Sequence, residues 1–172
     1  LVFGFAGGAS ALLVEYDFTG GSGNYSSLSF TESGVTTTAT ARYTGVFTSG
    51  PADVSWRSAG VGVLNSGLDS PDVDGRTRDD YLTFSFGEQV DLLGLNFGND
   101  TIDDEFDLFV DGVLVASNLE TIGGWEALAF SGTSFTVRAD QRNDDFTVSG
   151  LRASVPEPAT MLILGLGLVG LA

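Results

Sequence analysis

Asp111-Gly112 lies between two apolar runs in the stretch FDLFVDGVLVA, and few pairs of residues dictate a local structure as strongly. A type I′ turn needs a positive φ at both of its central residues, and Asp-Gly is one of the pairs that adopt this conformation readily. The stretch therefore predicts a β-hairpin with strands at residues 106–110 and 113–116.

A second stretch, YLTFSF, alternates between apolar and polar residues. Leu82, Phe84 and Phe86 would lie on one face of a strand, and Thr83 and Ser85 on the other. Turn-rich segments separate this strand from other short β-prone runs, which we expect at residues 12–18, 25–30, 35–43, 61–64, 90–97, 125–130, 134–139 and 146–153.

These runs predict an all-β chain, because none of them has the periodicity of an amphipathic helix. The 24 glycines support this prediction, since glycine is unfavourable inside helices and useful in turns. We expect one domain, an antiparallel β-sandwich of jelly-roll type, with a single barrel as the alternative. A length of 172 residues suffices for one such core.

The charge of the chain excludes several classes of function. There are 23 acidic residues against 7 basic ones, which gives a net charge of -16. Nucleic acid would be repelled by such a surface, so we do not expect it as a partner. The chain also lacks both His and Cys, which removes the usual general base, thiolate nucleophiles and disulfides.

The first residues, LVFGFAGGASA, resemble the end of a secretory signal peptide. An apolar run closes on small residues, with Ala9 and Ala11 in an A-x-A arrangement. We therefore interpret residues 1–11 as the remnant of a signal, with cleavage before Leu12. A buried first strand is the alternative, although Gly4 and Gly7 would weaken it.

The other end of the chain changes character at Val155. Pro156 and Pro158 favour extended backbone in the residues before them. We therefore expect the domain to end just before Val155 and to comprise residues 12–154. Twelve apolar residues then run from Met161 to Ala172. As a helix they would cover roughly 18 Å, against about 30 Å for the hydrocarbon core of a bilayer. We expect residues 155–172 to contain a short hydrophobic helix, part of a truncated transmembrane segment.

The stretch VPEPAT followed directly by an apolar run resembles the PEP-CTERM sorting signal. Pro156, Glu157 and Pro158 carry the motif, and Met161 to Ala172 its hydrophobic part. The basic tail typical of the family does not follow. The resemblance implies export in a Gram-negative bacterium that makes exopolysaccharide, transient anchoring in the membrane, and processing by exosortase. The stretches SAGVGVL and DDYLTFSF and the VDG hairpin are loosely similar to the β-sandwich regions of such surface proteins.

Three acidic loops are the candidates for chemistry in the domain. Calcium prefers six to eight oxygen ligands, which carboxylates and backbone carbonyls supply without His or Cys. We take the first loop as the candidate metal site, and the second and third loops offer similar oxygens. The first consists of Asp69, Asp72, Asp74, Asp79 and Asp80; the second of Asp100, Asp103, Asp104, Glu105 and Asp107; the third of Asp140, Asn143, Asp144 and Asp145.

The first loop does not fit the EF-hand pattern. Placing Gly75 at the sixth position puts Ser70 first, where Asp belongs, and Tyr81 twelfth, where Glu is required. Two interpretations stay open, a calcium site of another kind and a set of solvated turns.

The function that fits these features is an exported surface or extracellular-matrix protein with a non-catalytic body, for which we assign no catalytic residue. One alternative is a module that binds carbohydrate such as exopolysaccharide, for which Trp56 and Trp125 are the candidate ligand-binding residues. A second alternative is a glycosidase or lyase, in which two carboxylates would suffice, but no pair of them stands out in the sequence.

Overall fold

The computed structural model describes residues 11–45, 48–66, 69–76, 78–101, 103–121, 123–139 and 141–156. These residues form twelve β-strands and no helix, which confirms the all-β prediction. The strands are β1 (Leu12–Asp17), β2 (Gly23–Tyr25), β3 (Leu28–Glu32), β4 (Val35–Thr44), β5 (Ser49–Arg57), β6 (Gly60–Leu64), β7 (Val73–Asp74), β8 (Asp79–Gly98), β9 (Glu105–Val110), β10 (Val113–Glu120), β11 (Trp125–Ala139) and β12 (Asp145–Val155).

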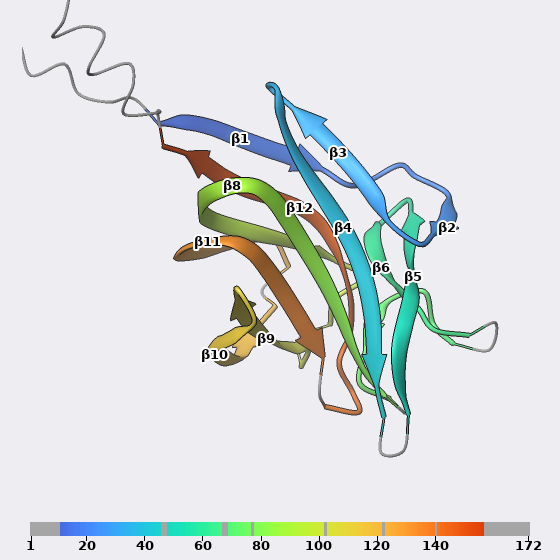
Figure 1. Ribbon diagram of the computed structural model, residues 1–172. Helices are drawn as coiled ribbons and strands as arrows, with labels where there is room; N and C mark the ends of the chain where they lie inside the picture. Colours follow the sequence, from blue (N-terminus) through green and yellow to red (C-terminus); the bar gives the residue numbers. More distant parts are fainter. Residues whose placement is uncertain are drawn as a thin grey trace, which may run out of the picture.

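All strand pairs are antiparallel. The order of the sheet is β1-β12-β6-β5-β4-β8-β11-β9-β10, and β12 also pairs with β8. The first half of β8 pairs with β4 and its second half with β12, so β8 bends between the two. Figure 1 shows this bend, which β11 follows alongside. The sheet therefore curves over its own inner face.

The core fills this inner face, and it follows the alternation of the strands. Leu82, Phe84 and Phe86 of β8 are buried, as the sequence predicts, and they pack with apolar residues of the other strands. Aromatic rings make up much of this core, including the contacts of Phe18 with Phe84 at 5.1 Å and of Phe97 with Phe106 at 4.8 Å between ring centroids.

The predicted hairpin is present as β9 and β10. Asp111 and Gly112 have φ values of 48° and 79°, as a type I′ turn requires. The Asp111 carboxylate also accepts hydrogen bonds from the backbone N–H groups of Thr133 and Ser134, each at 2.9 Å. The turn is thereby joined to β11.

Some strand boundaries differ from the prediction. The runs at residues 81–86 and 90–97 belong to one strand, β8, and those at 125–130 and 134–139 to one strand, β11. Strands β5 and β7 are absent from the prediction. Strand β5 contains Pro51, which lacks a backbone donor and is more typical of edges or turns. The sandwich of jelly-roll type stays a prediction, and the predicted C-terminal helix lies outside the described residues.

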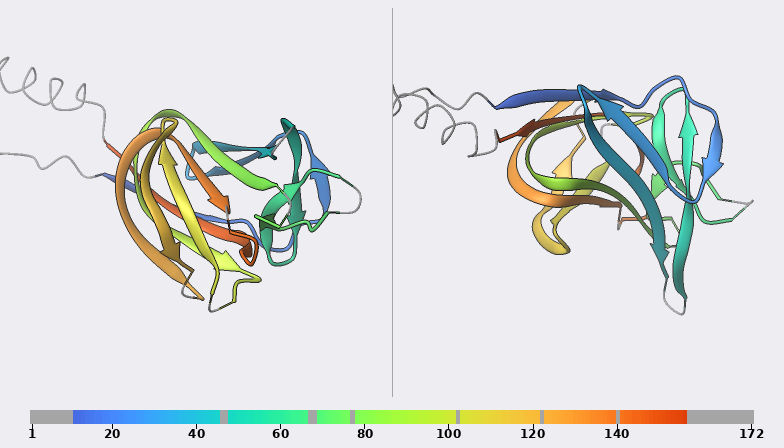
Figure 2. Two further views of the ribbon diagram at one scale, coloured as in Figure 1. Left: turned by 90° about the horizontal axis from the view of Figure 1, so that it is seen from below. Right: turned by 45° about the horizontal axis from the view of Figure 1, so that its top comes forward.

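The two ends of the body carry different features. Strand β1 begins at Leu12, which pairs with Val155 at the end of β12, so the start of β1 and the end of β12 lie side by side (Figure 1). Strand β12 begins at Asp145, about 30 Å away along the strand. At that distant end Asp145 pairs with Asp74, and both views in Figure 2 show the body extending away from the two chain ends.

Candidate functional site

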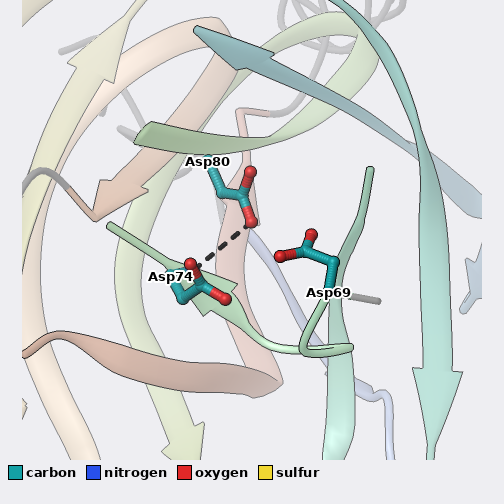
Figure 3. Close-up of side chains that lie close together, drawn as sticks. All are labelled: Asp69, Asp74 and Asp80. Atoms are coloured by element: carbon teal, nitrogen blue, oxygen red, sulfur yellow. Dashed lines mark hydrogen bonds between the residues drawn. The ribbon is translucent and has the colours of Figure 1, made fainter. Parts of the chain in front are cut away.

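The first acidic loop brings three carboxylates together. Asp69 lies in the loop after β6, Asp74 ends β7, and Asp80 is the second residue of β8. One carboxylate oxygen from each lies within 4.8 Å of the others. Figure 3 shows the three side chains directed toward one space between these elements. We call them the Asp69/Asp74/Asp80 cluster.

Two members of the cluster are inaccessible to solvent. Asp80 is 0% exposed and Asp74 is 3% exposed, whereas Asp69 is half-buried. Asp80 is held there by the register of β8, because residues 80, 82, 84 and 86 share the face that packs into the core. A buried carboxylate needs hydrogen bonds or a cation to offset its loss of hydration.

The hydrogen bonds to the Asp80 carboxylate are long. The side-chain amide of Asn65 donates to Asp80 Oδ1 at 3.3 Å, and the backbone N–H of Asp74 donates to Oδ2 at 3.4 Å. Asp74 Oδ1 accepts from the backbone N–H of Arg76 at 3.0 Å. The ion pairs found among the described residues join Arg138 to Asp79 and Asp107, and Arg152 to Glu15, so none of them involves the cluster.

This environment favours the neutral form of both buried carboxyls. Burial raises the pKa of Asp80 to about 8, and repulsion from Asp74 and Asp69 acts in the same direction. Burial also raises the pKa of Asp74 to about 6, although the N–H of Arg76 opposes this. The cluster can therefore do one of two things near neutral pH: keep protons, or bind a cation that neutralises it.

The other two residues predicted for this site lie outside the cluster. The Asp72 carboxylate accepts hydrogen bonds from Ser70 Oγ at 2.7 Å and from the side-chain amide of Asn99 at 3.2 Å. Asp79 Oδ2 lies 3.9 Å from a guanidinium nitrogen of Arg138. Asp72 thus joins two loops, and Asp79 points away from Asp80 because consecutive strand residues face opposite sides.

The second and third acidic loops brace each other instead of forming a cluster. Asp104 accepts from the backbone N–H of Thr101 in its own loop and from that of Asp145 in the other, the latter at 3.1 Å. Asp144 does the same with the backbone N–H groups of Gln141 at 3.0 Å and Glu105 at 3.2 Å. We call this reciprocal arrangement the Asp104/Asp144 latch.

A repeated pattern in the sequence marks the latch, although the prediction of three separate loops did not use it. Asp104-Glu105-Phe106 and Asp144-Asp145-Phe146 each place two acidic residues before a Phe at the start of a strand. The rings of Phe106 and Phe146 are both buried, with centroids 6.3 Å apart. The pattern therefore serves the fold, since each buried carboxylate accepts hydrogen bonds from backbone N–H groups of both loops.

Both predicted ligand-binding tryptophans pack against the body. Trp56 donates from Nε1 to the backbone oxygen of Phe18 at 2.6 Å, and its ring meets that of Phe30 edge-on. Trp125 lies under the guanidinium of Arg152, which is 3.8 Å from the ring centroid. Each ring is partly buried, and each already has a protein partner on one side.

A shallow depression of about 390 Å³ lies elsewhere, on strands β4, β5 and β8. It is lined by Thr40, Ala41, Arg42, Tyr43, Ser49, Gly50, Pro51 and Thr83. This depression holds no carboxylate and neither tryptophan. This depression therefore does not supply the acid pair that glycoside cleavage requires.

The last candidate site is the junction between the end of β12 and the predicted sorting motif. Ser154 and Val155 are the last residues of this strand, and they pair with Leu13 and Leu12 of β1. Pro156 comes directly after them and is exposed. A family model for the PEP-CTERM protein-sorting motif matches residues 154–172. The chain carries a PEP-CTERM sorting motif.

This motif implies an exported, surface-sorted protein that exosortase processes. Of the motif residues predicted from the sequence, Pro156 is described, whereas Glu157 and Pro158 lie outside the described residues. No curated protein and no solved structure matches the chain. Within the part of the chain that the structure describes, no helix is long and apolar enough to cross a membrane.

Proposed function

We propose that this protein is exported by a Gram-negative bacterium, processed by exosortase, and deposited at the cell surface or in an exopolysaccharide-rich matrix. The body would be a non-catalytic β-sandwich with a structural role. The observation that carries the proposal is the PEP-CTERM motif, which begins where the last strand ends. The A-x-A arrangement at Ala9 and Ala11 supports export independently.

The arrangement of polar groups in the body supports a structural role. Asp104 and Asp144 hold two loops together. Trp56 donates a hydrogen bond to the backbone of Phe18, and Trp125 packs against the guanidinium of Arg152. Catalysis by carboxylates would need two of them across a cleft, and recognition of a sugar would favour an open aromatic face. A protein of a surface layer or matrix needs neither feature.

We further propose that the Asp69/Asp74/Asp80 cluster binds calcium in the exported protein. Three carboxylates with oxygens within 4.8 Å of one another offer the hard oxygen ligands that calcium prefers. A calcium ion would neutralise the two buried carboxylates and join the loop after β6 to the start of β8. Its role would be to stabilise the body, since calcium binding to the folded state raises the free energy of unfolding.

Intact-mass measurement of the secreted protein tests the sorting function. We expect a mature chain that begins at Leu12 and lacks most of the residues after Pro158. Replacing the motif by Pro156→Ala, Glu157→Gln and Pro158→Ala together should leave the C-terminal segment attached, because the enzyme would lose its recognition sequence. The matched control is Pro71→Ala, which changes a proline outside the motif and should not alter processing.

Two outcomes of the mass measurement would contradict these expectations. A secreted wild-type chain that still ends at Ala172 or beyond would contradict processing by exosortase. A mature N-terminus before Leu12 would contradict the cleavage site but leave the C-terminal sorting function standing.

A further inference from the structure

The body and the sorting motif are joined without a spacer. The matched motif begins at Ser154, yet Ser154 and Val155 still belong to β12 and pair with β1. Ser154 is also opposite Asp91 of β8 in the sheet, and its Oγ lies 3.5 Å from an oxygen of that carboxylate. The last residues before Pro156 are therefore fixed to the folded body.

The length of the chain after this junction limits how far the body can lie from a membrane. Met161, the first residue of the apolar run, comes only six positions after Val155, and a fully extended chain of that length spans at most about 20 Å. A domain of this size is roughly 40 Å across. While the apolar run is held by a bilayer, the end of the body at the junction must stay near the bilayer surface.

Exposed leucines surround the junction. Leu13 of β1, on one side of β12, is 59% exposed. Leu12 is 44% exposed but points to the opposite face of the strand, the face of the buried Val14. Leu93 of β8, on the other side of β12, is 37% exposed. It lies in a β-bulge, because Leu92 pairs with Ala153 and Gly94 pairs with Arg152. Large apolar side chains thus flank the last strand on both sides.

Two acidic groups near these leucines, Glu15 and Asp91, have partners. Arg152 Nε donates to Glu15 at 2.7 Å, and Asp91 accepts hydrogen bonds from the hydroxyls of Ser131 and Ser154. The Asp69/Asp74/Asp80 cluster and the Asp104/Asp144 latch lie at the other end of β12. The acidic loops of the molecule therefore lie away from the junction end.

From these observations we propose that the face of the body that carries Leu13 and Leu93, beside the junction, docks on the lipid surface while the chain is anchored. The leucines would enter the interfacial region of the bilayer, where apolar side chains are stabilised by leaving water. This inference rests on the proposed function, because the C-terminal segment is what holds the junction at the membrane.

Single-cysteine reporters test the docking, since the chain has no cysteine of its own. The unprocessed precursor would carry an environment-sensitive maleimide dye at Leu13→Cys, at Leu93→Cys or at the control position Ser49→Cys. Ser49 is exposed and begins β5, far from the chain ends (Figure 1). Each protein is reconstituted into phosphatidylcholine vesicles with and without nitroxide-labelled lipid, and circular dichroism verifies its fold.

Docking predicts that the dye at residues 13 and 93 is quenched by the nitroxide lipid several-fold more than the dye at residue 49, and that its emission also shifts to the blue as it leaves water; quenching without the shift would show that the tether alone holds this end near the bilayer and would refute docking. Two reporter positions keep the test valid if one substitution disturbs folding. If the precursor floats with the vesicles but all three dyes are quenched equally, the docking surface is refuted and the anchoring stands. A precursor that does not float with vesicles at all would overturn both the docking and the membrane-anchored step of the proposed function.

Discussion

The stability of the protein should fall as pH rises from 5 to 8 when calcium is absent. Asp80 and Asp74 have folded-state pKa values of about 8 and about 6, both above the 3.8 of an unperturbed Asp. Between pH 3.8 and these values the folded protein keeps protons that the unfolded chain has lost. A raised carboxyl pKa therefore stabilises the fold at low pH, and this stabilisation is lost as pH rises toward the folded pKa.

The size of the effect can be calculated from the same pKa values. Each pH unit over which one extra proton is bound changes the free energy of unfolding by about 1.4 kcal/mol. From pH 5 to pH 8, Asp80 would contribute a loss of about 4 kcal/mol. Asp74 would add about 1 kcal/mol, mostly below pH 6. For a chain of this length the sum corresponds to a fall in melting temperature on the order of 10 °C or more.

The substitution Asp80→Asn tests this reasoning because it keeps the size of the side chain and removes the titrating group. In a chelating buffer at pH 8 we expect the variant to melt several degrees above the wild type, and its melting temperature to change less between pH 5 and pH 8. The matched control is Asp53→Asn, an exposed position on β5 that should keep the wild-type pH profile. Thermal unfolding followed by circular dichroism measures both.

Calcium should raise the melting temperature of the wild type toward that of Asp80→Asn. A site saturated at one hundred times its Kd stabilises the folded state by about 2.7 kcal/mol, and we expect this gain at pH 8 for the wild type but not for Asp80→Asn. The reference buffer contains sodium chloride at matched ionic strength, because any salt screens the repulsion in a chain with a net charge of -16. At pH 5 the gain should be smaller, since protons compete for the carboxylates.

Two results would refute the argument. If calcium raises the wild-type melting temperature no more than sodium chloride does, the calcium proposal is wrong. If Asp80→Asn is less stable than the wild type at pH 8 in the chelating buffer, ionisation of the buried Asp80 does not destabilise the fold as we infer.

Two further predictions concern the fold. In a urea titration, Gly112→Val should lower the free energy of unfolding by about 1–3 kcal/mol, because a β-branched residue resists the φ of 79° at the turn. The control is Gly87→Val in β8, which also has open space around it and should cost less. Equal costs for the two variants would contradict the predicted turn. Asp104→Ala and Asp144→Ala should each lower the free energy of unfolding by about 1–3 kcal/mol, because each removes two hydrogen bonds from backbone N–H groups to a buried carboxylate. The double mutant should cost less than the sum, whereas strict additivity would contradict the latch.

Local signals in the sequence were sufficient to predict those parts of the fold that depend on residues close together in the chain. The Asp111-Gly112 turn depends on two φ angles, and the burial of Leu82, Phe84 and Phe86 depends on the period of one strand. The bend in β8 was not predictable in this way. Gly87, Glu88 and Gln89 are exposed in the middle of the strand, and in sequence they have the character of a turn that ends one strand and begins another.

The membership of the candidate site was only partly predictable. The alternation that buries Leu82 also places Asp80 on the inner face and Asp79 on the outer face, so these two neighbours could have been separated from sequence. The separation of Asp72 from Asp74 could not, because it depends on the loop that carries Asn99, which lies 27 positions from Asp72 in the sequence. Contacts between distant loops are set by the pairing of the whole sheet.

The same sheet pairing explains how a short chain tolerates so many acidic residues at one end. Asp104 and Asp144 lose their hydration on burial and recover hydrogen bonds from backbone N–H groups, which carry no net charge. The Asp69/Asp74/Asp80 cluster has fewer such donors, so protonation or a cation must compensate for its burial. β12 separates these groups from Leu12 and Leu13 by its full length. If the chain is anchored after Val155, as we propose, its acidic loops would therefore face away from the membrane, where they could bind calcium.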